Sequence, residues 1–169
     1  MIPSATSTRP DIAFAVHQCT KFNANPKRCH KEAVKRIGRY LRRTQDKGLI
    51  LKSDKTQCLD CFVDADFAGS FCKEYAYHPS SVLSRTGHVL TYSGCPVSWV
   101  SKMQTEIALS KTEAEYIALS QSMQDLIPIR SILVELSNIL GLEINTPVTH
   151  STVYKDNNGA LELAKEPKY

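Results

Sequence analysis

The sequence predicts an α/β domain in which a mixed sheet carries packed helices. Three successive β-prone runs, Cys58 to Phe67, Thr86 to Tyr92 and Val97 to Ser101, predict a three-stranded antiparallel meander. A long helical pattern follows the meander, and a further strand and a further helix come after it. The body therefore has the order β-β-β-α-β-α, which is typical of a mixed sheet with helices packed against it.

The N-terminal segment predicts two helices before the sheet begins. Thr8 can cap a short helix with Pro10 in its first turn, and Asn23-Ala24-Asn25-Pro26 breaks that helix. A second helix is expected from about His30 to Arg43, because apolar residues recur on one side and basic residues cover the rest. Such a helix must dock on something apolar. Its candidate cations for nucleic-acid contacts are Lys35, Arg36, Arg39, Arg42 and Arg43.

Charge is distributed unevenly along the chain. Residues 1–55 contain 13 Lys/Arg and 4 Asp/Glu, a net charge of +9. Residues 56–169 contain 8 Lys/Arg and 13 Asp/Glu, a net charge of −5. A basic N-terminal segment followed by an acidic remainder fits a protein that binds phosphates in one region and performs metal chemistry in another. A solvated basic helix without a partner is the alternative, and charge alone slightly favours it.

The region after Gly48 predicts the remaining elements in order. They are a short strand at Leu49-Ile50-Leu51, a long loop over residues 68–84, a tight turn over residues 93–96, a helix from Ser110 or Thr112 to about Leu140, a strand from Thr149 to Lys155 and a helix from Asn158 to Lys165. Gly141 ends the long helix, and Pro128 inside it predicts a kink or a break. Trp99, in the last strand of the meander, is expected to pack in the core.

Three acidic positions predict a metal site. Asp64 and Asp156 each follow an apolar, β-prone run, and Glu115 lies in the first turns of the long helix. Carboxylates that end strands and line a helix packed on those strands can converge on one point. Three like charges at that point repel strongly unless a divalent cation neutralises them, and Mg²⁺ prefers oxygen ligands of this kind.

Helical geometry separates the two glutamates of the long helix. Glu113 and Glu115 point about 200° apart, and Glu115 shares the face that should meet the sheet. Glu113 lies nearer the polar flank and can serve the N-terminus of the helix. Two alternatives stay open at the end of the chain: Asp156 can be a plain helix cap, and Asn157 can either contact a nucleic-acid backbone or cap the last helix.

Composition excludes several classes of protein. The apolar content of 42% is enough for a core, and no apolar run approaches the roughly 20 residues that span a bilayer. The first six residues lack the basic start and apolar stretch of a signal peptide, so a secreted chain is not expected. The six cysteines show no regular spacing and are expected as reduced thiols. Cys58 and Cys61 lack the second pair that a structural zinc site would need.

A series of short motifs runs in order along nearly the whole chain. They are Thr8-Arg9-Pro10-Asp11-Ile12, His30 through Ala33, Lys35-Arg36-Ile37, Arg39-Tyr40-Leu41, Val63-Asp64-Ala65-Asp66-Phe67-Ala68-Gly69, Ser98-Trp99, Ser101-Lys102, Ala108-Leu109-Ser110, Glu113-Ala114-Glu115-Tyr116 and Asp156-Asn157. In this order the chain closely resembles the ribonuclease H region of Ty1/copia-type retrotransposon polyproteins. Each motif alone is weak, but their order and coverage together are specific.

The resemblance implies an RNase H-like fold over residues 48–169, preceded by a helical tail of the reverse transcriptase over residues 1–47. It implies cleavage of the RNA strand of RNA–DNA hybrids, with two Mg²⁺ or Mn²⁺ ions bound by the catalytic residues Asp64, Glu115 and Asp156. The implied partners are the hybrid and the rest of the polyprotein, with no small-molecule cofactor and no membrane. The implied location is the cytoplasm, within virus-like particles, and the nucleus.

Two departures from the family pattern qualify this expectation. Family members continue into a further helix that carries a fourth acidic residue, so an RNase H-like domain incomplete at its C-terminus is expected. The polymerase's own metal-binding aspartates are also absent, and DNA synthesis by this chain alone is therefore not expected. The alternative interpretation is an inactive retroelement remnant that retains at most nucleic-acid binding.

Overall fold

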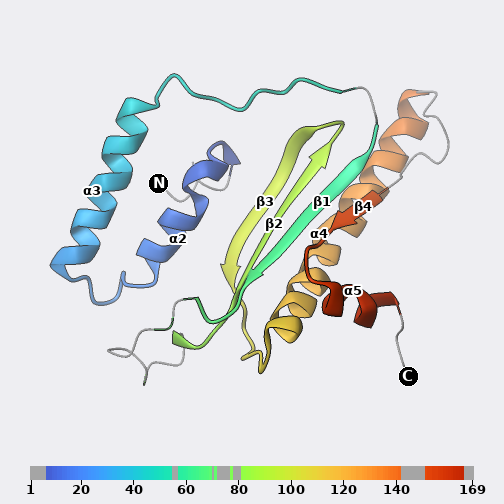
Figure 1. The fold of residues 1–169 in the computed structure, drawn as a ribbon. Helices are drawn as coiled ribbons and strands as arrows, with labels where there is room; N and C mark the ends of the chain where they lie inside the picture. The colour runs from blue at the N-terminus through green and yellow to red at the C-terminus, as the bar shows by residue number, and fades with distance from the viewer. Residues whose placement is uncertain are drawn as a thin grey trace.

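A mixed sheet organises the chain in the computed structural model, which describes residues 7–54, 57–69, 71, 77, 81–141 and 151–165 (Figure 1). In these residues the strand order is β3-β2-β1-β4, formed by β1 (Leu59–Asp66), β2 (Arg85–Tyr92), β3 (Cys95–Met103) and β4 (Ser151–Tyr154). β1 pairs antiparallel with β2 and parallel with β4, and β2 pairs antiparallel with β3. The predicted α/β class with a mixed sheet is confirmed.

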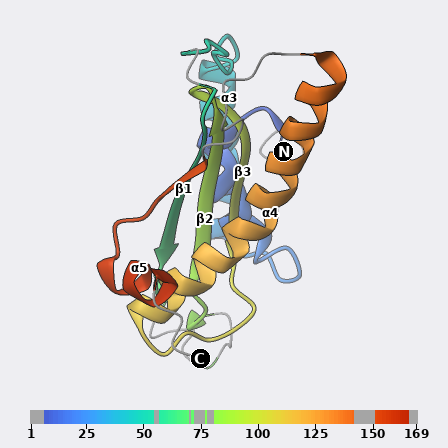
Figure 2. The same ribbon diagram turned by 90° about the vertical axis from the view of Figure 1, so that its right-hand side faces the viewer.

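Side chains of β1 alternate between the two faces of the sheet. Leu59, Cys61, Val63 and Ala65 are buried and belong to the main hydrophobic core, which α4 (Lys111–Leu140) covers. The residues between them face the opposite side, as the two-residue period of a strand requires. Figure 2 shows α4 running along one side of the sheet. One face of β1 thus builds the core, and the other is free for a site.

A two-residue turn joins β2 to β3. Ser93 and Gly94 have positive φ values of 49° and 75°, the backbone that matches the twist of a tight hairpin. The predicted turn over residues 93–96 is therefore shorter than expected, because Cys95 and Pro96 already belong to β3. β3 lies at the edge of the described sheet, where the missing N–H of a proline is tolerated.

Helix α4 has a well-defined start and end. The Ser110 hydroxyl accepts the Glu113 N–H at 3.1 Å, and the Glu113 carboxylate accepts the Leu109 N–H at 2.7 Å. Gly141 ends the helix in the left-handed conformation, with φ 59°. The predicted limits of this helix and the predicted role of Glu113 at its N-terminus are confirmed.

The N-terminal segment forms a 3₁₀ turn, η1 (Pro10–Ile12), and the helices α2 (Ala13–Thr20) and α3 (Arg28–Arg43). Ile12, Val16 and Ile37 are buried in a second hydrophobic cluster, separate from the main core. Arg9 donates to Asp11 and to the Thr44 carbonyl, and thereby ties the start of η1 to the end of α3. The apolar stripe of the basic helix docks on α2, as the pattern predicts.

Arg85 connects this segment to the sheet. Its side chain is buried on β2, donates to His17 Nδ1 at 2.6 Å, and lies 5.1 Å from the centre of the Phe14 ring. Because a guanidinium has no acceptor, His17 Nδ1 must be unprotonated in this contact. The contact of α2 with β2 therefore includes a hydrogen bond that needs a neutral histidine.

Helix α5 (Asn158–Lys165) begins directly after the last strand. The Asn157 carbonyl oxygen Oδ1 accepts the Ala160 N–H at 2.9 Å, so Asn157 caps this helix. A side-chain carbon added at Gly159 would lie 3.2 Å from Thr112 Cγ2, which shows how closely α5 approaches the start of α4. Capping therefore accounts for Asn157, and Asp156 stays outside the helix.

Two local predictions are wrong. Residues Leu49–Leu51 form no strand; Ile50 and Leu51 are 83% and 70% exposed, because the three-residue run has no strand beside it among the described residues. Arg9, not Thr8, occupies the cap position of η1. Of the kink or break predicted at Pro128, the break does not occur, since α4 continues on both sides of this residue. Most of the predicted loop over residues 68–84, and residues 149 and 150 of the last predicted strand, lie outside the described residues.

The described cysteines agree with the expected reduced thiols. Within the described residues all five cysteines, 19, 29, 58, 61 and 95, are free thiols. Burial raises the pKa of the Cys61 thiol, which suits an unreactive core residue. Among the helices of the described ranges, none combines the length and the apolarity that crossing a membrane requires.

We expect acid to weaken the docking of the N-terminal segment. Burial, and then the nearby cations Arg85 and Lys21, lower the pKa of His17 below its ordinary value of 6.5. Burial likewise lowers the pKa of His88. As the pH falls below about 6.5, the unfolded chain binds these protons before the folded chain does, so the free energy of unfolding decreases. The melting temperature should drop between pH 7 and pH 5, and drop less in His17→Gln. Identical pH profiles would contradict the role of His17.

We expect Asn157→Ala to lower the free energy of unfolding by about 1 kcal/mol, because it removes the cap of α5. Asn157→Ser keeps an oxygen acceptor at the same place and should restore most of this loss. Urea unfolding followed by circular dichroism measures both variants. Equal losses in the two variants would show that the contact to Ala160 does not stabilise the helix.

Candidate metal centre

Three carboxylates from three different elements meet at one end of the sheet. Asp64 lies near the end of β1, Asp156 lies just beyond β4, and Glu115 lies in the second turn of α4. Each offers one oxygen, and these oxygens all lie within 4.8 Å of one another. Asp64 and Asp156 are exposed, whereas Glu115 is fully buried. The predicted convergence of the three side chains is confirmed.

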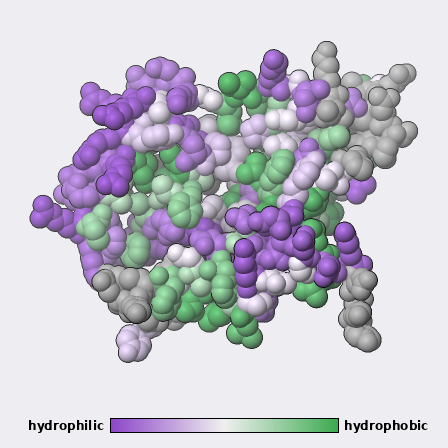
Figure 3. All heavy atoms as spheres, in the orientation of Figure 1, coloured by the Kyte–Doolittle hydropathy of each residue, from purple (hydrophilic) through white to green (hydrophobic). Residues whose placement is uncertain are grey.

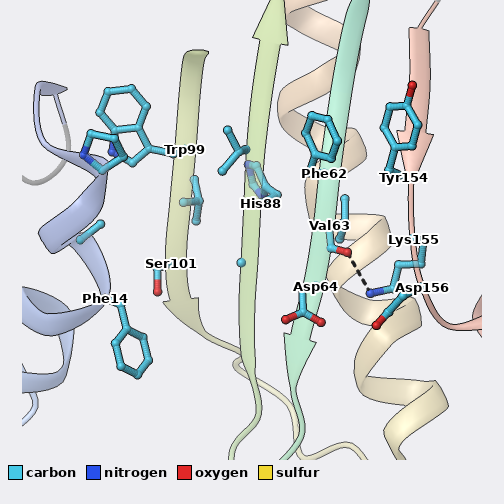
Figure 4. Close-up of a pocket in the computed structure, with 15 residues that line it drawn as sticks. Phe14, Phe62, Val63, Asp64, His88, Trp99, Ser101, Tyr154, Lys155 and Asp156 are labelled. Carbon is cyan, nitrogen blue, oxygen red and sulfur yellow. Dashed lines mark hydrogen bonds between the residues drawn. The ribbon is translucent and has the colours of Figure 1, made fainter. Parts of the chain in front are cut away.

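The parallel pairing of β1 with β4 brings the two aspartates together. Phe62 is the register partner of Tyr154, and their rings stack with centroids 4.8 Å apart. Asp64 and Asp156 each follow two residues later, so both point to the same face of the sheet. Figure 4 shows Asp64 on β1 and Asp156 just past β4, both below this aromatic pair. The register of two strands thus fixes the spacing of two candidate ligands.

Close packing of α4 on the sheet places Glu115. Its neighbour Ala114 and the residue one turn later, Ala118, are both fully buried, so the helix backbone approaches the strands closely. Gln104, just beyond β3, donates to Thr86 Oγ1 at 3.1 Å and to the Ala114 carbonyl at 2.9 Å. This amide fastens α4 to the sheet one residue before Glu115. Glu115 therefore lies on the face of α4 that meets the sheet, as predicted.

Lys155 also belongs to the centre, although it was not among the residues predicted from the sequence. Its ammonium group contacts Glu115 Oε2. It also donates to the Val63 carbonyl at 3.2 Å, the dashed line in Figure 4. The side chains of Lys155 and Glu115 are both 0% exposed. The signal that could have found it is strand alternation: Tyr154 faces the groove, so Lys155 must turn inward toward α4.

The residues at this centre fit a hard divalent cation. Three carboxylates provide only oxygen donors, the ligands that Mg²⁺ and Mn²⁺ prefer. Glu115 Oε1 is buried and has no hydrogen-bond partner among the described residues. A buried carboxylate oxygen without a partner is costly in an apolar surrounding, and a cation or a water bound there would satisfy it.

A groove of about 690 Å³ leads along the open face of the sheet to Asp64 and Asp156. Strand pairing sets Trp99, Val89, Phe62 and Tyr154 side by side in one row that crosses all four described strands. The next row contains Ser101, Gly87 and Asp64. Phe14 of α2 is among the other lining residues. Trp99 therefore lines the groove rather than the core, which corrects the prediction for this residue.

The basic residues of α3 do not join the carboxylates. Figure 1 shows α3 on the side of α2 away from the sheet, whereas β4 lies at the opposite edge. Lys35, Arg36, Arg39, Arg42 and Arg43 are all exposed, and Lys35 pairs with Glu32 at 3.1 Å. They contribute to the hydrophilic surface over α3 in Figure 3. The chain thus separates a basic surface from an acidic centre.

Comparison with known proteins identifies relatives over nearly the whole chain. It is 35% identical over 162 residues to the retrovirus-related Pol polyprotein from transposon RE1 of Arabidopsis thaliana, a match that covers 96% of the chain and 10% of the relative. The chain is 40% identical over 162 residues to the retrovirus-related Pol polyprotein from transposon TNT 1-94 of Nicotiana tabacum, a match that covers 96% of the chain and 11% of the relative. The chain therefore spans about a tenth of the length of these polyproteins.

A shorter relative matches as well. The chain is 41% identical over 118 residues to secreted RxLR effector protein 161 of Plasmopara viticola, with 70% of the chain and 78% of that protein covered. No family model and no solved structure matches the chain. The long matches to transposon polyproteins agree with the motif order along the chain. The chain therefore belongs to the family of Ty1/copia-type retrotransposon Pol polyproteins.

Proposed function

We propose that residues 48–169 are an RNase H-like domain that cleaves the RNA strand of RNA–DNA hybrids with the help of divalent cations. The observation that carries this proposal is the meeting of Asp64, Glu115 and Asp156 within 4.8 Å, in a chain of the Ty1/copia Pol family. The antiparallel pairs β1–β2 and β2–β3, the crossover through α4 and the parallel β4 are compatible with such a fold.

The three carboxylates have distinct tasks in the proposed reaction. Asp64 and Asp156 are exposed at the end of the groove, where they can bind cations and orient them toward a phosphate. Glu115 is held rigidly by α4 and completes the oxygen donor set from the buried side. When bound there, Mg²⁺ or Mn²⁺ would activate water and stabilise the charge on the phosphate and on the departing 3′ oxygen.

The groove supports a polymeric substrate rather than a small molecule. It is open, it reaches the carboxylates from the face that carries the Phe62–Tyr154 pair, and one wall comes from η1 and α2. Exposed aromatic rings beside carboxylates suit sugar and base surfaces next to a scissile phosphate. Selection would rest on hybrid shape and 2′-hydroxyl contacts, with little dependence on base sequence.

Residues 1–47 are proposed to be the helical tail of the reverse transcriptase, with the rest of the polyprotein as their partner. The separate hydrophobic cluster of Ile12, Val16 and Ile37 supports a structural unit distinct from the sheet domain. The exposed cations on α3 suit contacts to hybrid phosphates. If the carboxylates proved inactive, these cations would favour the second candidate function, nucleic-acid binding without cleavage.

We expect Asp64→Asn to reduce cleavage of RNA in a hybrid by more than about 100-fold. Replacing a residue that only hydrogen-bonds a metal ligand already lowers metal affinity or activity by about 10–100-fold, and Asp64 is proposed as a ligand itself. Cleavage is measured with a labelled hybrid and Mg²⁺ or Mn²⁺, both with the 169-residue chain and with a longer Pol segment that contains it.

Asp60→Asn is the matched control for this experiment. Asp60 lies on the same strand and the same face as Asp64, and it loses the same charge on substitution. Its activity should stay close to that of the unaltered chain, and both variants should keep their cooperative melting. Cleavage by Asp64→Asn at the unaltered rate would refute the nuclease proposal.

Replacing Arg36, Arg39 and Arg43 by Gln should weaken hybrid binding and make it less sensitive to salt. Each phosphate contact that is lost should reduce the slope of log K against log salt concentration by about 0.7–0.9. Fluorescence anisotropy at several salt concentrations measures this slope, with Arg130→Gln on α4 as the control for a general charge effect. An unchanged slope would exclude α3 from the interface.

A further inference from the structure

The side chain of Lys155 places a positive charge at the acidic centre. Lys155 Nζ contacts Glu115 Oε2 and donates to the Val63 carbonyl at 3.2 Å. Asp64 and Asp156 are the immediate sequence neighbours of Val63 and Lys155, and each offers a carboxylate oxygen within 4.8 Å of one from Glu115, the partner of Lys155. With both side chains 0% exposed, the Lys155–Glu115 pair is shielded from water. A positive charge is thus already present where three carboxylates converge.

We propose that the Lys155 ammonium takes the place of one of the two divalent ions, so that this chain binds a single divalent ion through Asp64 and Asp156. The inference rests on the metal-binding part of the proposed function. Glu115 Oε2 is engaged by the ammonium, so this oxygen becomes available to a second ion only when Lys155 is removed or moves away. Oε1 has no hydrogen-bond partner among the described residues and stays free to complete the donor set of the single ion. The two aspartates are exposed and can take up an ion from solvent.

The charges of the site support one ammonium group at Glu115 and one divalent ion at Asp64 and Asp156. A buried carboxylate needs a nearby positive charge, and Lys155 provides it for Glu115 without any metal. An ammonium group repels a divalent ion strongly at short distance when water is excluded. The remaining Asp64 and Asp156 carry enough negative charge for one divalent ion. A purely structural Lys155–Glu115 ion pair would instead leave metal binding unchanged when Lys155 is replaced.

The test is Mn²⁺ binding to the full chain without nucleic acid, measured by calorimetry and by electron paramagnetic resonance of the free ion. Four forms are compared: the unaltered chain, Lys155→Met, Lys155→Arg, and Lys155→Met combined with Glu115→Gln. Methionine removes the charge but keeps a long flexible side chain, whereas arginine keeps the charge. The double variant removes both partners of the buried pair.

The unaltered chain and Lys155→Arg should bind one Mn²⁺ each. Lys155→Met should bind two, with the tighter ion held at least about tenfold more strongly than in the unaltered chain, and the double variant should lose this gain. One ion with unchanged affinity in Lys155→Met, two ions in the unaltered chain, or a gain that persists in the double variant would each overturn the proposal. Absence of Mn²⁺ binding in all four forms would refute the metal site itself.

Replacing Lys155 alone leaves the Glu115 carboxylate buried without its partner, so Lys155→Met could require metal to fold. Thermal melting with and without Mn²⁺ keeps the inference testable in that case. Mn²⁺ should raise the melting temperature of Lys155→Met more than that of the unaltered chain, because a ligand stabilises the folded form in proportion to its affinity. An equal rise in both would overturn the proposal. Hybrid cleavage, measured separately, distinguishes this outcome from failure of the nuclease assignment.

Discussion

The site depends on one constraint: the buried carboxylate of Glu115 needs a positive charge beside it. Glu115 is fully buried beneath α4, and burying an unpaired ion of this size costs several kcal/mol. Lys155 reduces that cost only because β4 lies beside β1 in parallel register and brings its ammonium under the helix. The strand pairing, the close packing of α4 at Ala114 and Ala118, and the position of Lys155 therefore support one another.

The two faces of the sheet have different tasks because strand side chains alternate. On β1, Cys61 and Val63 enter the core, whereas Phe62 and Asp64 face the groove. Placing a charged residue two positions after an aromatic one costs the core nothing, since both lie on the open side. On β4 the same alternation sends Tyr154 to the groove and Lys155 inward. A single residue of register shift would exchange these tasks and destroy both core and site.

The sequence predicted the long elements and the acidic triad because each had a local signal with a clear physical basis. Ser110, Glu113 and Gly141 are cap residues at the ends of α4, and Asp64 and Asp156 follow β-prone runs. What failed depended on neighbours distant in sequence. Leu49–Leu51 has strand propensity but no pairing partner, and Trp99 faces a groove whose wall comes from α2. The contact between Lys155 and Glu115 was missed because it depends on packing between β4 and α4.

Parallel pairing of β1 with β4 also determines when the centre can exist during folding. The Lys155–Val63 contact joins residues 92 positions apart, and the long helix α4 must be in place between them. Contacts of such high sequence separation form slowly, after local hairpins and helices. A partly folded intermediate with only the β1–β2–β3 hairpins and α4 would contain Asp64 and Glu115 but not Asp156 or its neighbouring ammonium. The complete constellation therefore depends on the four-residue β4, and loosening of this strand would separate Asp156 and Lys155 from the other residues of the centre.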